Sequence, residues 1–174
     1  MLNIDMPPQV RDFIISFARF EYALKRAGYV AERGASHDAQ VNWPAFEKAN
    51  HEAFRNSLAQ PNKQLQSAIK SLDAEPPRKL VLHRTDGIRE LRWKPARPNG
   101  QLLNRYLAYV RRVRNNLFHG EKPQTLMGDS TRGLELVQSA LAILEACVSL
   151  DPTVEHYFHE YAPAIPRLDD VPYQ

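Results

Sequence analysis

The feature that most constrains this fold is a four-and-three spacing of apolar residues in the segment ahead of His119. Such spacing is typical of a helix that buries one face against neighbouring helices. Arg114 stands where the next apolar residue is expected, and arginine is almost never fully buried without a partner. The position therefore needs a carboxylate, a phosphate or a second subunit opposite it. The apolar members are Leu103, Leu107, Val110 and Leu117.

The same spacing predicts the other helices and the fold class. One helix follows Pro7-Pro8 and ends near Gly28, a second runs from the cap Asn42 to Pro61, and a third leads into Pro76-Pro77. The helix with Arg114 is expected to stop at Gly120. A long helix follows Gly128-Asp129-Ser130, and Asp151-Pro152 begin a last short one. These elements predict an all-α fold, an antiparallel helical bundle of about five helices.

The pattern changes to that of strands between residues 76 and 98. Two runs, Lys79 to His83 and Ile88 to Trp93, flank Asp86-Gly87, a dipeptide typical of hairpin turns. We expect a small β-hairpin or an extended flap here, inserted into the bundle. With 174 residues, 43% of them hydrophobic, the chain can bury one good core. We therefore expect a single domain over residues 1–174, with an irregular tail from 163 to 174.

Four arginines crowd the predicted helix just before His119. The net charge of +3 is compatible with a polyanionic partner but does not require one. The local density is the better indication of phosphate binding, although a surface helix is often rich in arginine for solubility alone. The candidate RNA-binding residues are Arg105, Arg111, Arg112 and Lys122.

The cysteine content and the apolar segments bear on the compartment. Cys147 is the only cysteine, so no internal disulfide can form, and a buried small hydrophobe is its expected role. The N-terminus has no basic stretch followed by an apolar run, and no later segment is a long apolar span. We expect a cytoplasmic protein without a membrane segment.

The run Arg114-Asn115-Asn116-Leu117-Phe118-His119 resembles the signature of the HEPN superfamily. Ribonuclease members carry an arginine, usually a polar residue, several further positions and then histidine. The wider string is similar to prokaryotic members of defence, toxin and plasmid systems. The resemblance implies an all-helical fold and a homodimer whose motif helices pair across a two-fold axis. It also implies RNA as substrate, no cofactor or metal, and a cognate antitoxin or regulatory protein as a further partner.

The residue types suit metal-independent RNA cleavage. Histidine as a residue type has an unperturbed pKa of about 6.5, near operating pH, so an imidazole at position 119 suits proton transfer. Arg114 is always charged and donates bidentately, which suits the phosphate of the transition state, and Asn115 can orient either partner. On an ideal helix, Arg114 and His119 are separated by roughly 7.5 Å of rise and about 140° of rotation. They need not meet within one chain, which agrees with the implied homodimer.

Two other interpretations stay open for this motif. In the first, Arg114 pairs with Glu21 or another acid as a structural contact, and His119 caps a helix end. In the second, the protein is a non-catalytic helical module that binds RNA or a partner protein. Elsewhere, His156 and His159 with neighbouring acids form only a weak candidate metal site, and a solvated polar face is the more common explanation.

Overall fold

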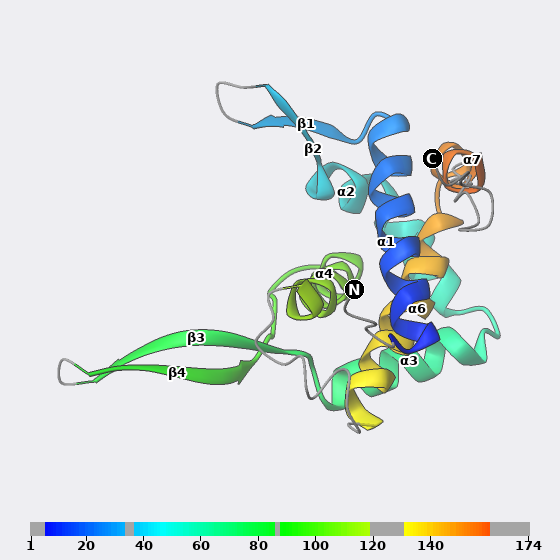
Figure 1. Ribbon diagram of the computed structural model, residues 1–174. Helices are drawn as coiled ribbons and strands as arrows, with labels where there is room; N and C mark the ends of the chain where they lie inside the picture. Colours follow the sequence, from blue (N-terminus) through cyan, green and yellow to red (C-terminus); the bar gives the residue numbers. More distant parts are fainter. Residues whose placement is uncertain (1–5, 34–36, 86–87, 119–130, 161–174) are drawn as a thin grey trace, which may run out of the picture.

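The computed structural model describes residues 6–33, 37–85, 88–118 and 131–160, and it is not an all-α bundle. The described residues form six helices and two two-stranded antiparallel sheets, 66% helix and 17% strand. The expected all-α bundle of about five helices is therefore wrong, because both hairpins are part of the fold. Figure 1 shows a body of helices from which the two hairpins extend.

The helices occupy most of the predicted positions. No helix among them is both long and apolar enough to cross a membrane on its own. The helix α6 packs against α1, α3 and α4, and its buried residues make one core with those of the other five described helices. The bounds are α1 (Pro8–Arg26), α2 (Trp43–Leu58), α3 (Lys63–Ala74), α4 (Leu102–Phe118), α6 (Thr131–Val148) and α7 (Pro152–Glu160).

Side chains at the helix starts make the caps that their residue types favour. The Oδ1 atom of Asn42 accepts from the backbone N–H of Ala45 at 3.1 Å, which confirms the predicted start of α2. Asp151 accepts from the N–H groups of Thr153 and Val154 at the start of α7. Four predicted features lie outside the described residues: the turn at Asp86-Gly87, the helix end at Gly120, the loop at residues 128–130 and the tail at 163–174.

The buried face of α4 differs from the prediction at Arg114. Leu103, Leu107 and Val110 are buried as expected, but Val113 continues the apolar face. Arg114 is half-buried at the flank of this face. A step of three and a step of four both return to the same side of a helix, so the sequence alone did not decide which residue faces the core.

The first hairpin was not predicted. Strands β1 (Val30–Arg33) and β2 (Asp38–Val41) pair in antiparallel register, with Val30 opposite Val41. Gly28, with φ of +90°, reverses the chain at the end of α1, a conformation that glycine adopts without strain. The strands are short and largely exposed, so their sequence lacks the alternation that marks a half-buried strand.

The second hairpin is present where the Asp-Gly signal predicted it. Strands β3 (Arg78–Thr85) and β4 (Ile88–Pro95) pair along all eight residues and project away from the helices (Figure 1). At its base, the N–H of Ala96 donates to the carbonyl of Pro77 at 2.9 Å. The Nδ2 atom of Asn116 in α4 donates to the carbonyl of Arg78 at 2.9 Å. The hairpin is therefore tied to the body at its base alone, among the described residues.

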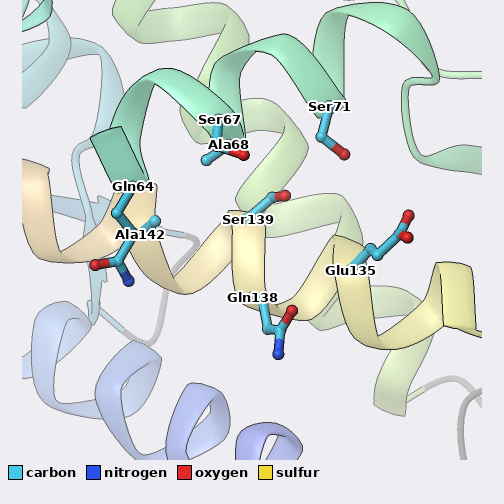
Figure 2. A pocket seen from close by; sticks show the side chains of 8 residues that line it. All are labelled: Gln64, Ser67, Ala68, Ser71, Glu135, Gln138, Ser139 and Ala142. Carbon is cyan, nitrogen blue, oxygen red and sulfur yellow. The ribbon is translucent and has the colours of Figure 1, made fainter. Parts of the chain in front are cut away.

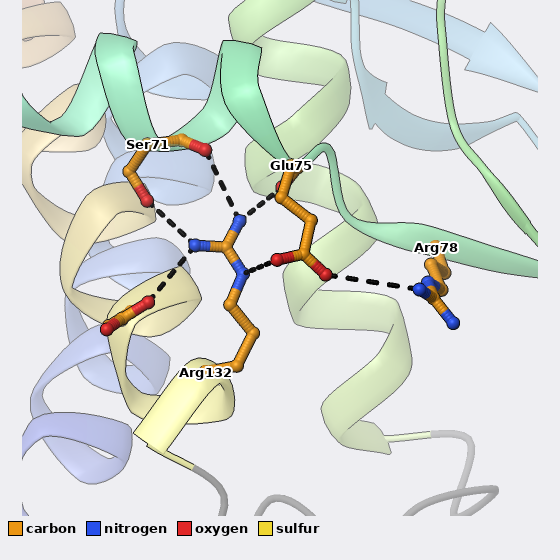
Figure 3. Close-up of polar contacts among 5 residues, drawn as sticks. Ser71, Glu75, Arg78 and Arg132 are labelled. Carbon is orange, nitrogen blue, oxygen red and sulfur yellow. Dashed lines mark hydrogen bonds and ion pairs between the residues drawn. The ribbon is translucent and has the colours of Figure 1, made fainter.

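Arg132 joins the first turn of α6 to the last turn of α3 (Figure 3). Its guanidinium donates to the hydroxyl of Ser71 at 2.9 Å and to the carbonyl oxygens of Ser71 and Glu75. The carboxylates of Glu75 and Glu135 lie 3.4 and 3.2 Å from it. Carbonyls at the end of a helix are free to accept from a cation, so Arg132 closes the end of α3 beside the base of the β3–β4 hairpin.

Tyr29 links three separate parts of the body. Its hydroxyl donates to the Oδ2 atom of Asp151 at 2.6 Å and accepts from Nδ2 of Asn50 in α2 at 3.3 Å. Burial and the bond to Asp151 raise the pKa of Tyr29. Burial works to raise the pKa of Asp151, but the bonds from Tyr29 and from the backbone of α7 outweigh it and lower the pKa.

We expect Tyr29→Phe to lower the free energy of unfolding by about 1–3 kcal/mol, because Asn50 and Asp151 each lose a partner in a half-buried site. Urea denaturation measures this difference. Tyr157→Phe is the control, since its ring stays under Arg26. Equal stability of parent and Tyr29→Phe would show that water replaces the hydroxyl without cost.

Candidate functional site

Arg114 is held by aromatic rings rather than by an acid. Its guanidinium carbon lies 5.7 Å from the ring centroid of Phe17 in α1 and 4.7 Å from that of Phe118. Its Nη1 atom donates to Oδ1 of Asn115 at 3.2 Å. Within the described residues, no carboxylate lies within 4.0 Å of it. Contacts of this kind stabilise the cation and leave its charge unneutralised.

A second arginine lies on the same side of α4. Arg111 is three positions before Arg114, and its guanidinium carbon lies 5.1 Å from the ring centroid of Trp43 at the start of α2. The rings of Trp43 and Phe17 are themselves 6.1 Å apart. We call Phe17, Trp43, Arg111, Arg114 and Phe118 the basic-aromatic face. It places two positive charges over buried rings from α1 and α2.

Glu21 is an acid whose pKa is influenced by both arginines of this face. It is half-buried on α1, and burial raises its pKa, while the charges of Arg114, Lys25 and Arg111 lower it less. The sequence suggested a structural pair between Glu21 and Arg114. The structure brings their charges into range of each other without an ion pair shorter than 4.0 Å between them. A carboxyl that is harder to ionise competes less with a phosphate for Arg114.

The raised pKa of Glu21 has a consequence for stability. In the folded state its ionisation is disfavoured relative to the unfolded chain, so stability is lost as pH rises above the ordinary value near 4.5. We expect Glu21→Gln to unfold at a higher temperature than the parent at about pH 8, with a smaller difference near pH 4. Thermal unfolding across this range measures the effect. A variant less stable than the parent at about pH 8 would instead support a favourable Glu21–Arg114 pair.

The other predicted RNA-binding arginines of α4 lie on a different side. Arg105 is nine positions before Arg114, about 180° away on a helix, and its Nη2 atom lies 3.6 Å from the carboxylate of Asp73 in α3. It also donates to the hydroxyl of Tyr106, which donates to Asp73. Arg112 is seven positions after Arg105 and shares its side. The structure therefore divides the four arginines into two pairs.

The remaining predicted site residues are at or beyond the end of α4. Asn115 is half-buried beside Arg114. His119 and Lys122 lie outside the described residues. Phe118, which directly precedes His119 in the chain, is 54% exposed. An exposed aromatic ring at this end of the helix leaves apolar surface next to Arg114.

A groove between α3 and α6 does not belong to this site. It has a volume of about 500 Å³, and Figure 2 shows small and polar side chains along it. None of the predicted site residues contributes to it. The short side chains of its Ser and Ala residues leave space between the two helices unfilled, which accounts for the groove without a ligand. The lining residues are Gln64, Ser67, Ala68, Ser71, Glu135, Gln138, Ser139 and Ala142.

Other candidate chemistry receives little support from the geometry. Cys147 is buried, and burial raises the pKa of its thiol far above the usual range, so the thiolate is disfavoured. The Nε2 atom of His156 lies 3.8 Å from Glu160, and both side chains are mostly exposed. Across the described segments, no group of three or more His, Cys, Asp or Glu side chains comes together as a metal site.

The rings of Phe17, Trp43 and Phe118 are the part of the site that the sequence did not reveal. In the sequence, Phe17 and Trp43 have the helical spacing of core residues, so a role in the site was not expected. The structure shows that both are buried in the core and also contact the arginines. Comparisons of the chain with protein-family models, with curated proteins and with solved structures found no significant match. The resemblance to the HEPN superfamily therefore rests on the sequence motif alone.

Proposed function

We propose that the protein is a cytoplasmic, metal-independent endoribonuclease of the HEPN type. Its working pair is Arg114 and His119, with Asn115 in support. The observation that carries the proposal is the state of Arg114: half-buried, positioned by the rings of Phe17 and Phe118, and without a carboxylate partner among the described residues. A guanidinium that is positioned but not neutralised is suited to binding a phosphate.

The reaction needs two proton transfers and one cation. The 2′-oxygen of the RNA attacks the adjacent phosphorus and gives its proton to a base. The bond from phosphorus to the 5′-oxygen then breaks, and this oxygen takes a proton from an acid. The products carry a 2′,3′-cyclic phosphate and a 5′-hydroxyl. One copy of His119 performs one of these two proton transfers, and Arg114 stabilises the negative charge on the phosphorane oxygens.

A homodimer supplies the second proton-transfer group. His119 is the single histidine of the motif, and an ideal helix turns it about 140° from Arg114. Pairing of two α4 helices brings two copies of both residues to one cleft. The exposed ring of Phe118, beside Arg114, supports an apolar contact between copies at this end of the helix. A cognate antitoxin or regulatory protein is a further partner in this proposal.

The experiment is cleavage of a mixed RNA pool by the purified protein in excess EDTA. We expect fragments with 2′,3′-cyclic phosphate ends from the parent and no detectable fragments, over the same time, from His119→Ala prepared in the same way. Cleavage by both preparations would point to a contaminating nuclease. No cleavage by either would favour the second candidate function.

The second candidate is a non-catalytic module that binds RNA or a protein. The position of Arg111 favours it, because this exposed side chain lies over Trp43 on the same side as Arg114. Two stacked guanidinium groups form a binding surface whether or not His119 takes part in chemistry. RNA binding without cleavage in EDTA or in Mg²⁺ is the result expected from such a module.

A further inference from the structure

The β3–β4 hairpin, called the arm from here on, carries a charge out of proportion to its size. Its two strands contain six arginine and lysine residues and one acid, Glu90, a net charge of +5. The whole chain has a net charge of only +3, so the rest of the chain carries −2. The positive charge of this protein is therefore concentrated on one projecting element (Figure 1).

Two pairs of like charges face each other across the arm. Lys79 is opposite Lys94, and Arg84 is opposite Arg89. Like charges directly opposite in an antiparallel pair are destabilising. Glu90, the acid on the strands, is bound by Arg92 at 2.8 Å. Within the described residues, none of the four facing cations has an ion pair, so the arm maintains uncompensated charge.

The cations occupy both faces of the arm. Arg84 and Arg89 share a face with Leu82 and Leu91, which are 48% and 66% exposed. The pair of Lys79 and Lys94 is separated from the pair of Arg84 and Arg89 by an odd number of positions along each strand. Because successive side chains of a strand point to opposite faces, the two lysines lie on the other face. A flat anionic surface can contact only one face at a time. A flexible polyanionic strand can cross the edge of the ribbon and contact both.

The arm is fixed to the C-terminal end of α4, on the side of Arg105 and Arg112 and about 160° around the helix from Arg114. Its base is bound by Asn116, two residues after Arg114 on α4, through the carbonyl of Arg78. Eight residues per strand give it a length of roughly 25 Å. A strand of nucleic acid bound along the arm therefore leads toward the end of α4.

We propose that the arm binds the phosphate backbone of single-stranded RNA through Arg84 and Arg89 at its outer end and Lys79 and Lys94 at its base. The choice of RNA over DNA rests on the proposed ribonuclease function. The arm holds the substrate, and the basic-aromatic face acts on it. The exposed Leu82 and Leu91 give the bases an apolar surface beside the outer arginines.

The test is binding of a short, mixed-sequence, fluorescein-labelled 2′-O-methyl RNA, followed by fluorescence anisotropy. This probe has no free 2′-hydroxyl, so it cannot be cleaved by the proposed reaction. We expect the double variant Arg84→Gln, Arg89→Gln to bind at least roughly tenfold more weakly than the parent. The slope of log Kd against log salt should fall by about 1.4, because each single-strand phosphate contact accounts for about 0.7.

The matched control removes two charges from the body. Arg11 and Arg55 are exposed on α1 and α2, far from the arm in the chain, and each touches only a neighbouring acid among the described residues. The double variant Arg11→Gln, Arg55→Gln should bind the RNA like the parent. The arm variant should be at least as stable as the parent, because a repulsive pair has been removed. An equal loss of affinity in both variants would show a general charge effect and overturn the proposal.

Three further outcomes would also overturn it. The first is unchanged RNA binding by the arm variant, and the second is a loss confined to duplex DNA. The third concerns the double variant Leu82→Gln, Leu91→Gln. If it binds RNA like the parent but has a different oligomeric state, the arm serves as a contact with a second copy of this chain. The binding assay uses an uncleavable probe, so its result does not depend on cleavage activity. RNA binding by the arm with no cleavage in EDTA would contradict the proposed function and leave this inference standing, so the two proposals are tested separately.

Discussion

Replacing His119 by alanine is expected to lower the rate of RNA cleavage by a factor of about 10²–10⁴, the usual contribution of a general acid or base. We expect the fold to be unaffected, because the buried residues of the described part of α4 end at Val113, six positions before this residue. Initial rates of cleavage in EDTA measure the effect. Circular dichroism and light scattering report the fold and the oligomeric state of the same sample.

His156→Ala is the matched control for this variant. His156 is a mostly exposed histidine on α7, with Glu160 at 3.8 Å from its ring. Its removal should leave the cleavage rate at the level of the parent. If His119→Ala unfolds or changes its oligomeric state, the residue has a structural role at the end of α4. If it cleaves as fast as the parent, the proposed mechanism is wrong.

Replacing Arg114 by lysine is expected to lower kcat/KM by about 10²–10³, the cost of losing one preorganised donor to the transition state. Lysine retains the charge but cannot donate two parallel hydrogen bonds to a phosphate. It also stacks less well on the rings of Phe17 and Phe118, which position the guanidinium. Steady-state kinetics on a defined RNA measure the loss.

Arg111→Lys is the comparison for Arg114→Lys. Arg111 has the same type of contact, over Trp43, but is exposed and lies one turn farther from His119. We expect it to change substrate binding and to leave kcat close to that of the parent. An Arg114→Lys variant that loses stability and keeps its activity would show that Arg114 covers the aromatic core and does no more.

The helices could be predicted because their signals are local. Asn42 and Asp151 form caps through contacts within their own first turns, and most apolar residues of the spacing predicted for α1 are buried. In α6, Val137, Leu144 and Val148 are buried as predicted, whereas Leu134 and Leu141 are half-buried. The pairing of β1 with β2 depends on a chain reversal at Gly28 and on few apolar residues. Nothing local in those short, polar strands favours a sheet over a loop, so the all-α prediction failed at this point.

The site was predictable in part for the same reason. Arg114 stood out because it interrupts an apolar pattern, and the need for a partner followed from its charge alone. The partner itself is a tertiary contact: rings from α1 and from the end of α4 face the guanidinium, although Glu21 was an equally reasonable expectation. Likewise, the ion pair of Arg105 with Asp73 joins residues 32 positions apart, which helix spacing cannot reveal.

The register of the arm limits how its length can change during evolution or by design. Removing one cross-strand pair, such as Val81 with Arg92, exchanges the faces of every pair beyond it. The outer part of the arm would then be turned over relative to the base, which Asn116 fixes. The side chains that would exchange faces include Leu82, Leu91, Arg84 and Arg89. Relatives of this protein should therefore differ in arm length by two residues per strand, or by none.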